Sequence, residues 1–138
     1  MLTKKDLEKL AQIRADDALF LFKSGRASSA YYLAGYSIEL ALKACISNLM
    51  QANVIPDKAF INAIYTHKLD ALLSTAGLRP QFSTDSRANS QFAAYWAIVT
   101  KWTEESRYEF WDPMAAASLL EAVHDPDNGV FQWLKKHW

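Results

Sequence analysis

The segment Arg26–Gln51 (RASSAYYLAGYSIELALKACISNLMQ) constrains the fold more than any other part of the chain. It contains no proline and one glycine, and its apolar residues recur every three or four positions, which is the repeat of an amphipathic helix. Many of these residues are small, so a neighbouring helix can approach closely. The sequence therefore predicts a long central helix in an all-α protein. The apolar stripe consists of Ala27, Tyr31, Ala34, Ile38, Ala41, Leu42, Cys45 and Leu49.

Helix signals continue on both sides of this segment. Thr3 is expected to cap a first helix, with Asp6 as its capping-box partner and Gly25 at its end. A link as short as Gly25 makes the first two helices antiparallel. The downstream patterns predict a short helix at Lys58–Ile64, then a helix at His67–Ala76 that is capped by Thr66 and ended by Gly77, and a break at Arg79-Pro80. An aromatic-rich helix is expected to begin near Asp85 or Ser86 and to reach Trp102, and an irregular connection follows at Thr103–Trp111. Asp112-Pro113 starts the next helix, and a final short helix is expected at Val130–Trp138.

The absence of any sustained β alternation completes the prediction of fold class. We expect an antiparallel up-and-down bundle of four main helices, with one or two extra short helices, in a single domain that spans residues 1–138. Five Trp, six Tyr and seven Phe are more than a small bundle obviously requires. These aromatic residues fill either a subunit interface or the core, and the sequence leaves both possibilities open.

Composition excludes several classes of protein. The formal net charge is zero, so no strong overall field draws the chain to nucleic acid or to a membrane. No apolar run approaches the length of a membrane span, and the polar N-terminal residues do not resemble a secretory signal. Cys45 is the only cysteine and lies within an apolar helical pattern, which predicts a buried, inert thiol. We therefore expect a cytoplasmic protein without disulfides.

Three segments together resemble the HEPN domain family of small helical-bundle proteins. The segments are YYLAGYSIELALKA (31–44), YTHKLDALLSTAGL (65–78) and KWTEESRY (101–108). The resemblance covers nearly the whole chain and implies an up-and-down bundle of four to five helices that forms a homodimer. It also implies a place in toxin–antitoxin or defence systems, where such domains often act beside a nucleotidyltransferase partner. Other members of the family are non-catalytic and are proposed to bind nucleotide or RNA.

The nuclease branch of that family carries an arginine followed, after four to six residues, by a histidine. In that pair the imidazole exchanges protons and the guanidinium holds the scissile phosphate. No arginine of this chain has a histidine at the required distance, so the motif of the family's ribonucleases is absent. The arginines are Arg14, Arg26, Arg79, Arg87 and Arg107, and the histidines are His67, His124 and His137.

Arg107 and Tyr108 occupy the connection where the nuclease motif would be expected. Arg107 is a candidate to contact a phosphate and Tyr108 to stack on a base, and with Glu105 they form a candidate variant catalytic site. The structural alternative is that Tyr108 closes one end of the bundle and that Arg107 forms an ion pair. Its candidate partners are Glu39, Glu104, Glu105 and Asp112.

Four further residues are candidates for ligand binding. His67 and Lys68 are expected to open a helix, where backbone N–H groups attract anions. The alternative is that His67 is a packed polar residue and Lys68 a solvated one. Glu39 and Lys43 have the favourable i, i+4 order of an ion pair. If Glu39 is buried it needs a partner, either Lys43 or a distant arginine, whereas an exposed pair would have no special role.

Other kinds of site have little support in the sequence. No pair of cysteine or histidine residues has metal-ligand spacing, and no glycine-rich phosphate loop is present, so we predict no metal and no cofactor. Three functions remain open. The chain is a non-catalytic homodimeric module that binds nucleotide, RNA or a protein, a toxin-type endoribonuclease with a variant site around Arg107, or a purely structural interaction protein of a toxin–antitoxin or defence locus.

Overall fold

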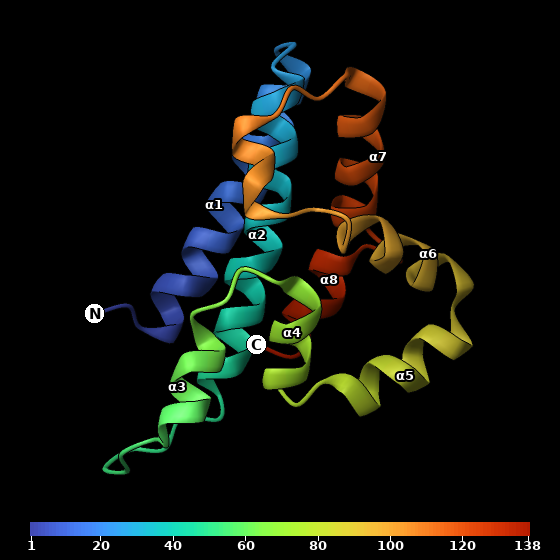
Figure 1. Cartoon of the computed structure of the whole chain (residues 1–138). Coiled ribbons are helices and arrows are strands. Elements are labelled where there is room, and N and C mark those ends of the chain that lie inside the picture. The colour runs from blue at the N-terminus through green and yellow to red at the C-terminus, as the bar shows by residue number, and fades with distance from the viewer.

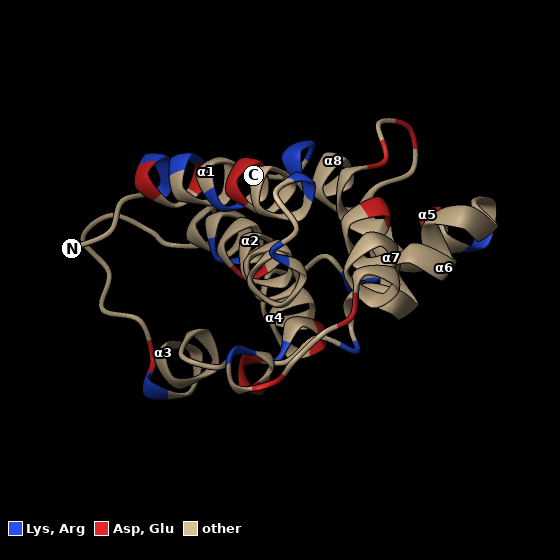
Figure 2. Ribbon diagram, turned by 90° about the horizontal axis from the view of Figure 1, so that it is seen from above, with Lys and Arg blue, Asp and Glu red and all other residues tan.

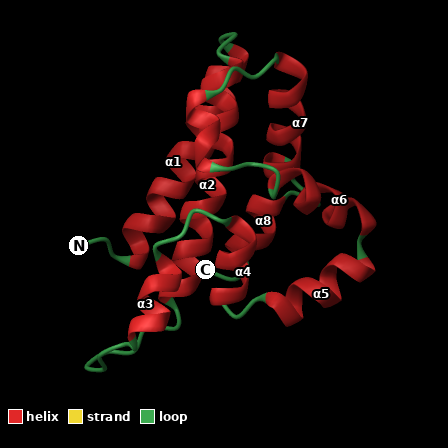
Figure 3. Ribbon diagram, in the orientation of Figure 1, coloured by secondary structure: helices red, strands yellow, loops and turns green.

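The computed structural model describes residues 1–138, and every regular element in it is a helix (Figures 1 and 3). This confirms the prediction of an all-α protein. Eight α-helices and one 3-10 helix, η1, follow one another along the chain. Their bounds are α1 (Lys4–Lys23), α2 (Ala27–Ser47), α3 (Lys58–Ile64), α4 (Leu69–Thr75), α5 (Arg79–Ala88), α6 (Ser90–Val99), η1 (Glu104–Tyr108), α7 (Pro113–His124) and α8 (Val130–Lys135).

The helices α1 and α2 form an antiparallel hairpin. Thr3 and Asp6 make the predicted capping box at the start of α1. Gly25 has a φ of 79° in the link between the two helices, a conformation that residues with a side chain rarely adopt. Alanines fill the contact between the helices, which brings their backbones close together. Those with no exposed surface are Ala11, Ala15, Ala18, Ala30, Ala34, Ala41 and Ala44.

The central helix is α2, as the sequence predicts. It packs against α1, α4, α7, α8 and η1, whereas α3 and α5 lie at the edge of the molecule (Figure 1). Neither α3 nor α5 contains a buried residue. Basic and acidic residues are interspersed along α1, and no single sign of charge dominates the view in Figure 2. None of the helices combines the length and the apolar character needed to cross a bilayer.

The central helix is shorter than the sequence predicts, because it ends at Ser47 and not at Gln51. Leu49, which the helical pattern places on the buried stripe, is 48% exposed. The neighbouring helix α1 begins only at Lys4, and the charge of Lys4 acts on Cys45, two residues before the end of α2. Residues 48–51 are all exposed, so continuing α2 would bury little apolar surface.

The segment from Thr66 to Ala88 also differs from the prediction. Helix α4 begins at Leu69, not at His67, and its N-cap is Lys68. Thr66 does not cap it, because its Oγ accepts a hydrogen bond from the backbone N–H of Lys68 and forms a local turn. Pro80 does not mark a break either. It lies in the first turn of α5, where its missing N–H costs nothing.

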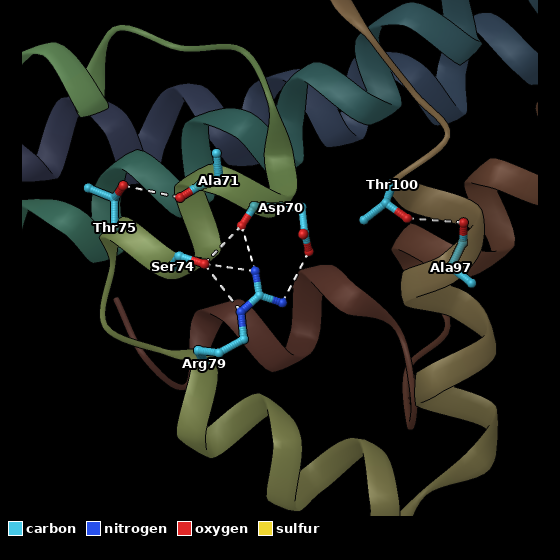
Figure 4. A network of polar contacts seen from close by, with 7 residues as sticks. All are labelled: Asp70, Ala71, Ser74, Thr75, Arg79, Ala97 and Thr100. Carbon is cyan, nitrogen blue, oxygen red and sulfur yellow. Dashed lines mark hydrogen bonds and ion pairs between the residues drawn. The ribbon is translucent and has the colours of Figure 1, made fainter.

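A polar network joins α4 to α5 (Figure 4). The Arg79 guanidinium donates from Nη1 to Asp70 Oδ1 at 3.1 Å and from Nη2 to the Asp70 carbonyl at 2.8 Å. It also donates from Nε and Nη2 to the hydroxyl of Ser74, at 3.2 Å and 2.8 Å. The arginine that the sequence assigns to a break therefore anchors the start of α5 to the preceding helix.

The aromatic helix of the second half, α6, and the last helix, α8, have other bounds than the sequence predicts. Helix α6 starts at Ser90, with Asn89 as its cap, and ends at Val99, so the expected cap at Asp85 or Ser86 is wrong. Asp85 instead accepts a hydrogen bond from Trp133 Nε1 at 2.8 Å. Helix α8 stops at Lys135, three residues before the predicted end. Four rings pack against one another where α5, α6 and α8 meet, namely Phe82, Phe92, Trp96 and Trp133.

Trp102 lies outside α6 and packs against the backbone of α2. A Cβ atom added to Gly35 would come within 2.2 Å of the Trp102 ring, far closer than atoms can approach. Cys45 is buried, as predicted, and burial raises the pKa of its thiol to about 12. The thiol is therefore protonated near neutral pH and has little reactivity.

Burial lowers the pKa of His124 below its ordinary value of 6.5, although the backbone of Ala15 and the carboxylate of Asp16 act in the opposite direction. In the unfolded chain the ring regains the ordinary pKa. Below about pH 6.5 the unfolded chain therefore binds a proton that the folded chain resists, and stability falls as the pH falls.

We expect the variant His124→Phe to lose less stability than the wild type on acidification. The difference in melting temperature between about pH 7.5 and pH 5.5 should be about 2–4 °C smaller in the variant. Thermal denaturation followed by circular dichroism at both pH values measures this difference. Because only the pH dependence is compared, any change that phenylalanine makes to packing cancels. Equal pH dependence in the two proteins would exclude His124 as a source of acid sensitivity.

Candidate functional site

The candidate site is centred on Glu39, a carboxylate in the middle of α2 whose side chain is only 2% exposed. Its Oε2 lies 3.2 Å from the Lys43 ammonium, one turn further along the same helix. Its Oε1 lies 2.8 Å from Nδ1 of His67. The predicted ion pair is therefore present, but Glu39 is buried and has a second partner, a histidine. The partner is not the distant arginine that the sequence also allowed.

His67 comes from the turn between α3 and α4. The following helix packs onto α2 through Leu69 and Leu72, both buried, and this contact holds the turn over Glu39. The His67 side chain is 48% exposed and that of Lys43 is 18% exposed. The cluster therefore runs from a fully buried carboxylate to an imidazole at the surface. We name Glu39, Lys43 and His67 the Glu39 cluster.

Two exposed residues flank His67 in the chain. Tyr65 is 78% exposed, and Lys68 is exposed directly after the histidine. Lys68 makes no ion pair, so its charge is available to an anion. The expected contribution from a helix N-terminus is wrong, however, since α4 starts only after these residues and has seven residues. Any attraction for an anion here comes from side chains.

Arg107 and Tyr108 lie elsewhere, in η1. Both are exposed, and the Arg107 guanidinium stacks over the ring of Tyr108, with Cζ 4.9 Å from the ring centre. Arg107 forms no ion pair with any of its four expected partners, and Glu105 is also exposed and unpaired. Both oxygens of Glu39 are occupied by other residues. The structure therefore does not join Arg107 to the Glu39 cluster.

The segment that contains η1 is held mainly by aromatic packing. Trp111 stacks on Tyr31 with the ring centres 3.8 Å apart, and the Trp111 backbone N–H donates to the Ser28 hydroxyl at 2.8 Å. Three buried polar atoms of the segment have no hydrogen-bond partner, namely Trp102 Nε1, Ser106 Oγ and Trp111 Nε1. Beside this buried side, the segment and the start of α7 present apolar side chains to solvent. Tyr108 is 71% exposed, Phe110 100% and Met114 84%.

The Glu39 cluster can act on a ligand in two ways. An ionised carboxylate only accepts hydrogen bonds, so Nδ1 of His67 must carry the hydrogen between them. Nε2, on the other side of the ring, makes no hydrogen bond in the structure, and the side chain that carries it is 48% exposed. When the ring is neutral, Nε2 accepts a proton or a hydrogen bond, and when the ring is protonated, Nε2 donates to an anion. Lys68, the next residue in the chain, is exposed and adds a positive charge to the same turn.

The sequence indicates each residue of the Glu39 cluster as a candidate, but it does not predict that Glu39 and His67 are in contact. The spacing of Glu39 and Lys43 predicts their contact, because both lie on one face of one helix. His67 is 28 residues away from Glu39, and no local pattern links them. The only hint in the sequence is that the two belong to segments 31–44 and 65–78, which carry most of the family resemblance.

No group of three or more histidine, cysteine, aspartate or glutamate side chains in the structure is arranged to hold a metal ion.

Two surface hollows lie away from the Glu39 cluster. One, of about 340 Å³, is lined largely by polar residues and lies where the α5–α6 junction, the α7–α8 turn and α8 meet. The other, of about 390 Å³, is lined largely by apolar residues after α2.

Comparison of the chain with family models, with curated proteins and with solved structures found no match.

Proposed function

We propose that the chain is a non-catalytic binding module of the HEPN type, which binds a phosphate-bearing ligand, nucleotide or RNA, at the Glu39 cluster. The observation that carries this proposal is the buried Glu39 carboxylate, which orients the half-exposed His67 at 2.8 Å. Burying a carboxylate is costly, and a chain that needed only packing would be as stable with an apolar residue there. A role of His67 in ligand binding would explain why a buried carboxylate orients this imidazole, on a turn that also carries Lys68.

The surroundings of His67 favour a ligand with both phosphate and base. Lys68 and the protonated form of His67 are donors suited to phosphate oxygens. Tyr65, whose ring is 78% exposed, offers a face on which a base can stack.

The proposal also includes the arrangement of the helices and the setting of the protein. We propose an antiparallel bundle of four main helices, in a cytoplasmic protein of a toxin–antitoxin or defence system.

Titration with ATP and with a fluorescently labelled single-stranded RNA tests the proposal. Calorimetry and fluorescence anisotropy should show saturable binding of at least one of the two. The variants His67→Ala and Lys68→Ala should each weaken it about tenfold, which is about 1.4 kcal/mol. His137→Ala removes a histidine outside the cluster and serves as the matched control. Absence of saturable binding, or equal binding by the His67→Ala protein, would contradict the proposal.

A second candidate function is favoured by the exposed apolar residues beside η1. Tyr108, Phe110 and Met114 are each more than two-thirds exposed, and aromatic side chains and methionine are enriched in protein interfaces. We propose that this surface forms the homodimer or binds a protein partner of the nucleotidyltransferase type. Light scattering on the purified chain tests the first of these. A dimer that Phe110→Asp converts to a monomer supports the homodimer, and a monomeric wild type would contradict it.

The third candidate, a toxin-type ribonuclease around Arg107, has weaker support. Its three residues are exposed, and Arg107 stacks on its own neighbour without contacting Glu105 through an ion pair. Such a site has no buried group that fixes a catalytic side chain in position. Breakdown of the labelled RNA in the binding experiment, lost in Arg107→Ala, would favour this alternative over the binding module.

A further inference from the structure

His67 differs from the other two histidines in both partner and exposure. His124 is partly buried, and its Nε2 is enclosed without a hydrogen-bond partner. His137 stacks on Trp133 with the ring centres 4.6 Å apart and has no carboxylate within ion-pair distance. Only His67 combines a carboxylate on Nδ1 with a side chain that is 48% exposed. Any reaction that requires an oriented, accessible Nε2 should therefore select His67.

The carboxylate does more than hold the ring in place. Because Glu39 accepts the Nδ1 hydrogen, the neutral ring keeps its lone pair on Nε2, the nitrogen that no protein group engages. Glu39 is 2% exposed, so water does not compete for this contact. The geometry thus gives Nε2 the properties of a nucleophile with a fixed tautomer and direction.

The charges around the ring suit a phosphoryl group. Lys43, 3.2 Å from the other oxygen of Glu39, offsets the buried negative charge. Lys68 is exposed and follows His67 directly in the chain, so the turn that carries the ring also carries a second positive charge. A phosphoryl group on Nε2 would therefore be attached on a turn that also carries a cation, and the Glu39 carboxylate would lie at the opposite nitrogen of the imidazole.

From these contacts we infer that His67 is a phosphorylation site, which accepts a phosphoryl group on Nε2 from an acyl phosphate. In the reaction the Nε2 lone pair attacks phosphorus, and an N–P bond forms as the P–O bond to the acyl group breaks. The bonding electron pair leaves with the carboxylate product. The ring keeps its Nδ1 hydrogen, and Glu39 balances the positive charge that the imidazole gains. This uses the same cluster as the proposed function but needs no bound nucleotide, so either can fail without the other.

Incubation of the full chain with acetyl phosphate tests the inference. Intact-mass spectrometry should show the addition of one phosphoryl group that is lost in acid and retained in alkali, as expected of phosphohistidine. Fragmentation should place it on His67. The variant His67→Gln should not react, while His124→Gln and His137→Gln should react like the wild type. Glu39→Gln should react about tenfold or more slowly, because an amide does not orient the ring as a carboxylate does.

The positioning role of Glu39 is separated from a role in folding by two measurements. Circular dichroism and melting temperature show whether Glu39→Gln is folded, and Lys68→Ala, at an exposed position, should slow the reaction without changing stability. The inference would be overturned by modification of all three histidines at equal rates, by modification of His137 alone, or by no modification. A folded Glu39→Gln protein that reacts at the wild-type rate would overturn it as well.

Discussion

Replacing Gly35 by alanine is expected to lower the free energy of unfolding by about 2–3 kcal/mol. In the interior of an exposed helix the same change normally stabilises a protein by about 0.5–1 kcal/mol. Here the sign is reversed because the new Cβ would lie 2.2 Å from the Trp102 ring. Trp102 is 2% exposed and cannot turn aside without disturbing the packing of α2. Urea denaturation of the two proteins measures the difference.

Two further variants isolate the contact between Gly35 and Trp102. Ser29→Ala, at an exposed position on the same helix, controls for the gain in helix propensity and should be neutral or slightly stabilising. Combining Gly35→Ala with Trp102→Leu should cost less than the sum of the single changes, since a smaller side chain leaves room for the methyl group. If Gly35→Ala were as stable as the wild type, the close packing of the Trp102 ring on α2 would be wrong.

Replacing Glu39 by alanine is expected to lower the free energy of unfolding by about 3 kcal/mol. The variant loses the contacts of Glu39 to Lys43 and His67 and leaves a cavity in the middle of α2. Lys43, only 18% exposed, then holds a charge with no partner in a largely dry site. His67 is 48% exposed and can be hydrated, so His67→Ala should cost less than about 1 kcal/mol.

The double variant Glu39→Met with Lys43→Met separates stability from function. Replacing both charges of a buried pair by apolar side chains of similar volume is often neutral or stabilising. We therefore expect urea denaturation to show a double variant about as stable as the wild type. It should nevertheless fail to bind nucleotide or RNA and to accept a phosphoryl group at the normal rate. A stable double variant that kept both activities would show that the Glu39 cluster has no function.

Local signals in the sequence predict helix ends well where the cap is made within a few residues. The capping box of Thr3 and Asp6, the cap of Asp112 on α7 and the bounds of α3 are all as predicted. These signals succeed because the interacting groups lie within one turn of each other. They fail at Thr66 and at Asp85 or Ser86, which do not cap the helices expected there. They also fail at Pro80, since a proline is compatible with both a break and a first turn. Only the contacts of Arg79 with α4 decide between the two.

In the candidate site, too, the sequence predicts the local contact and does not predict the long-range one. Glu39 and Lys43 are predicted as a pair from their spacing, whereas the sequence makes His67 a candidate for ligand binding only because it is expected to open a helix. The contact between Glu39 and His67 is not predicted, because it depends on how α4 packs on α2. The absence of a contact between Glu39 and Arg107 is equally non-local, since the residues on either side of η1 pack on the first half of α2, with Trp111 on Tyr31 and Trp102 on Gly35.

The sequence by itself determined that the chain is all-helical and that the segment after Arg26 is the central helix, because periodicity and composition act locally. It also determined that Lys43 lies beside Glu39. Only the tertiary structure decided where α2 ends, which residues close over Gly35, and which side chain meets the second oxygen of Glu39. These outcomes depend on contacts between residues far apart in the chain, and such contacts form only when the helices pack.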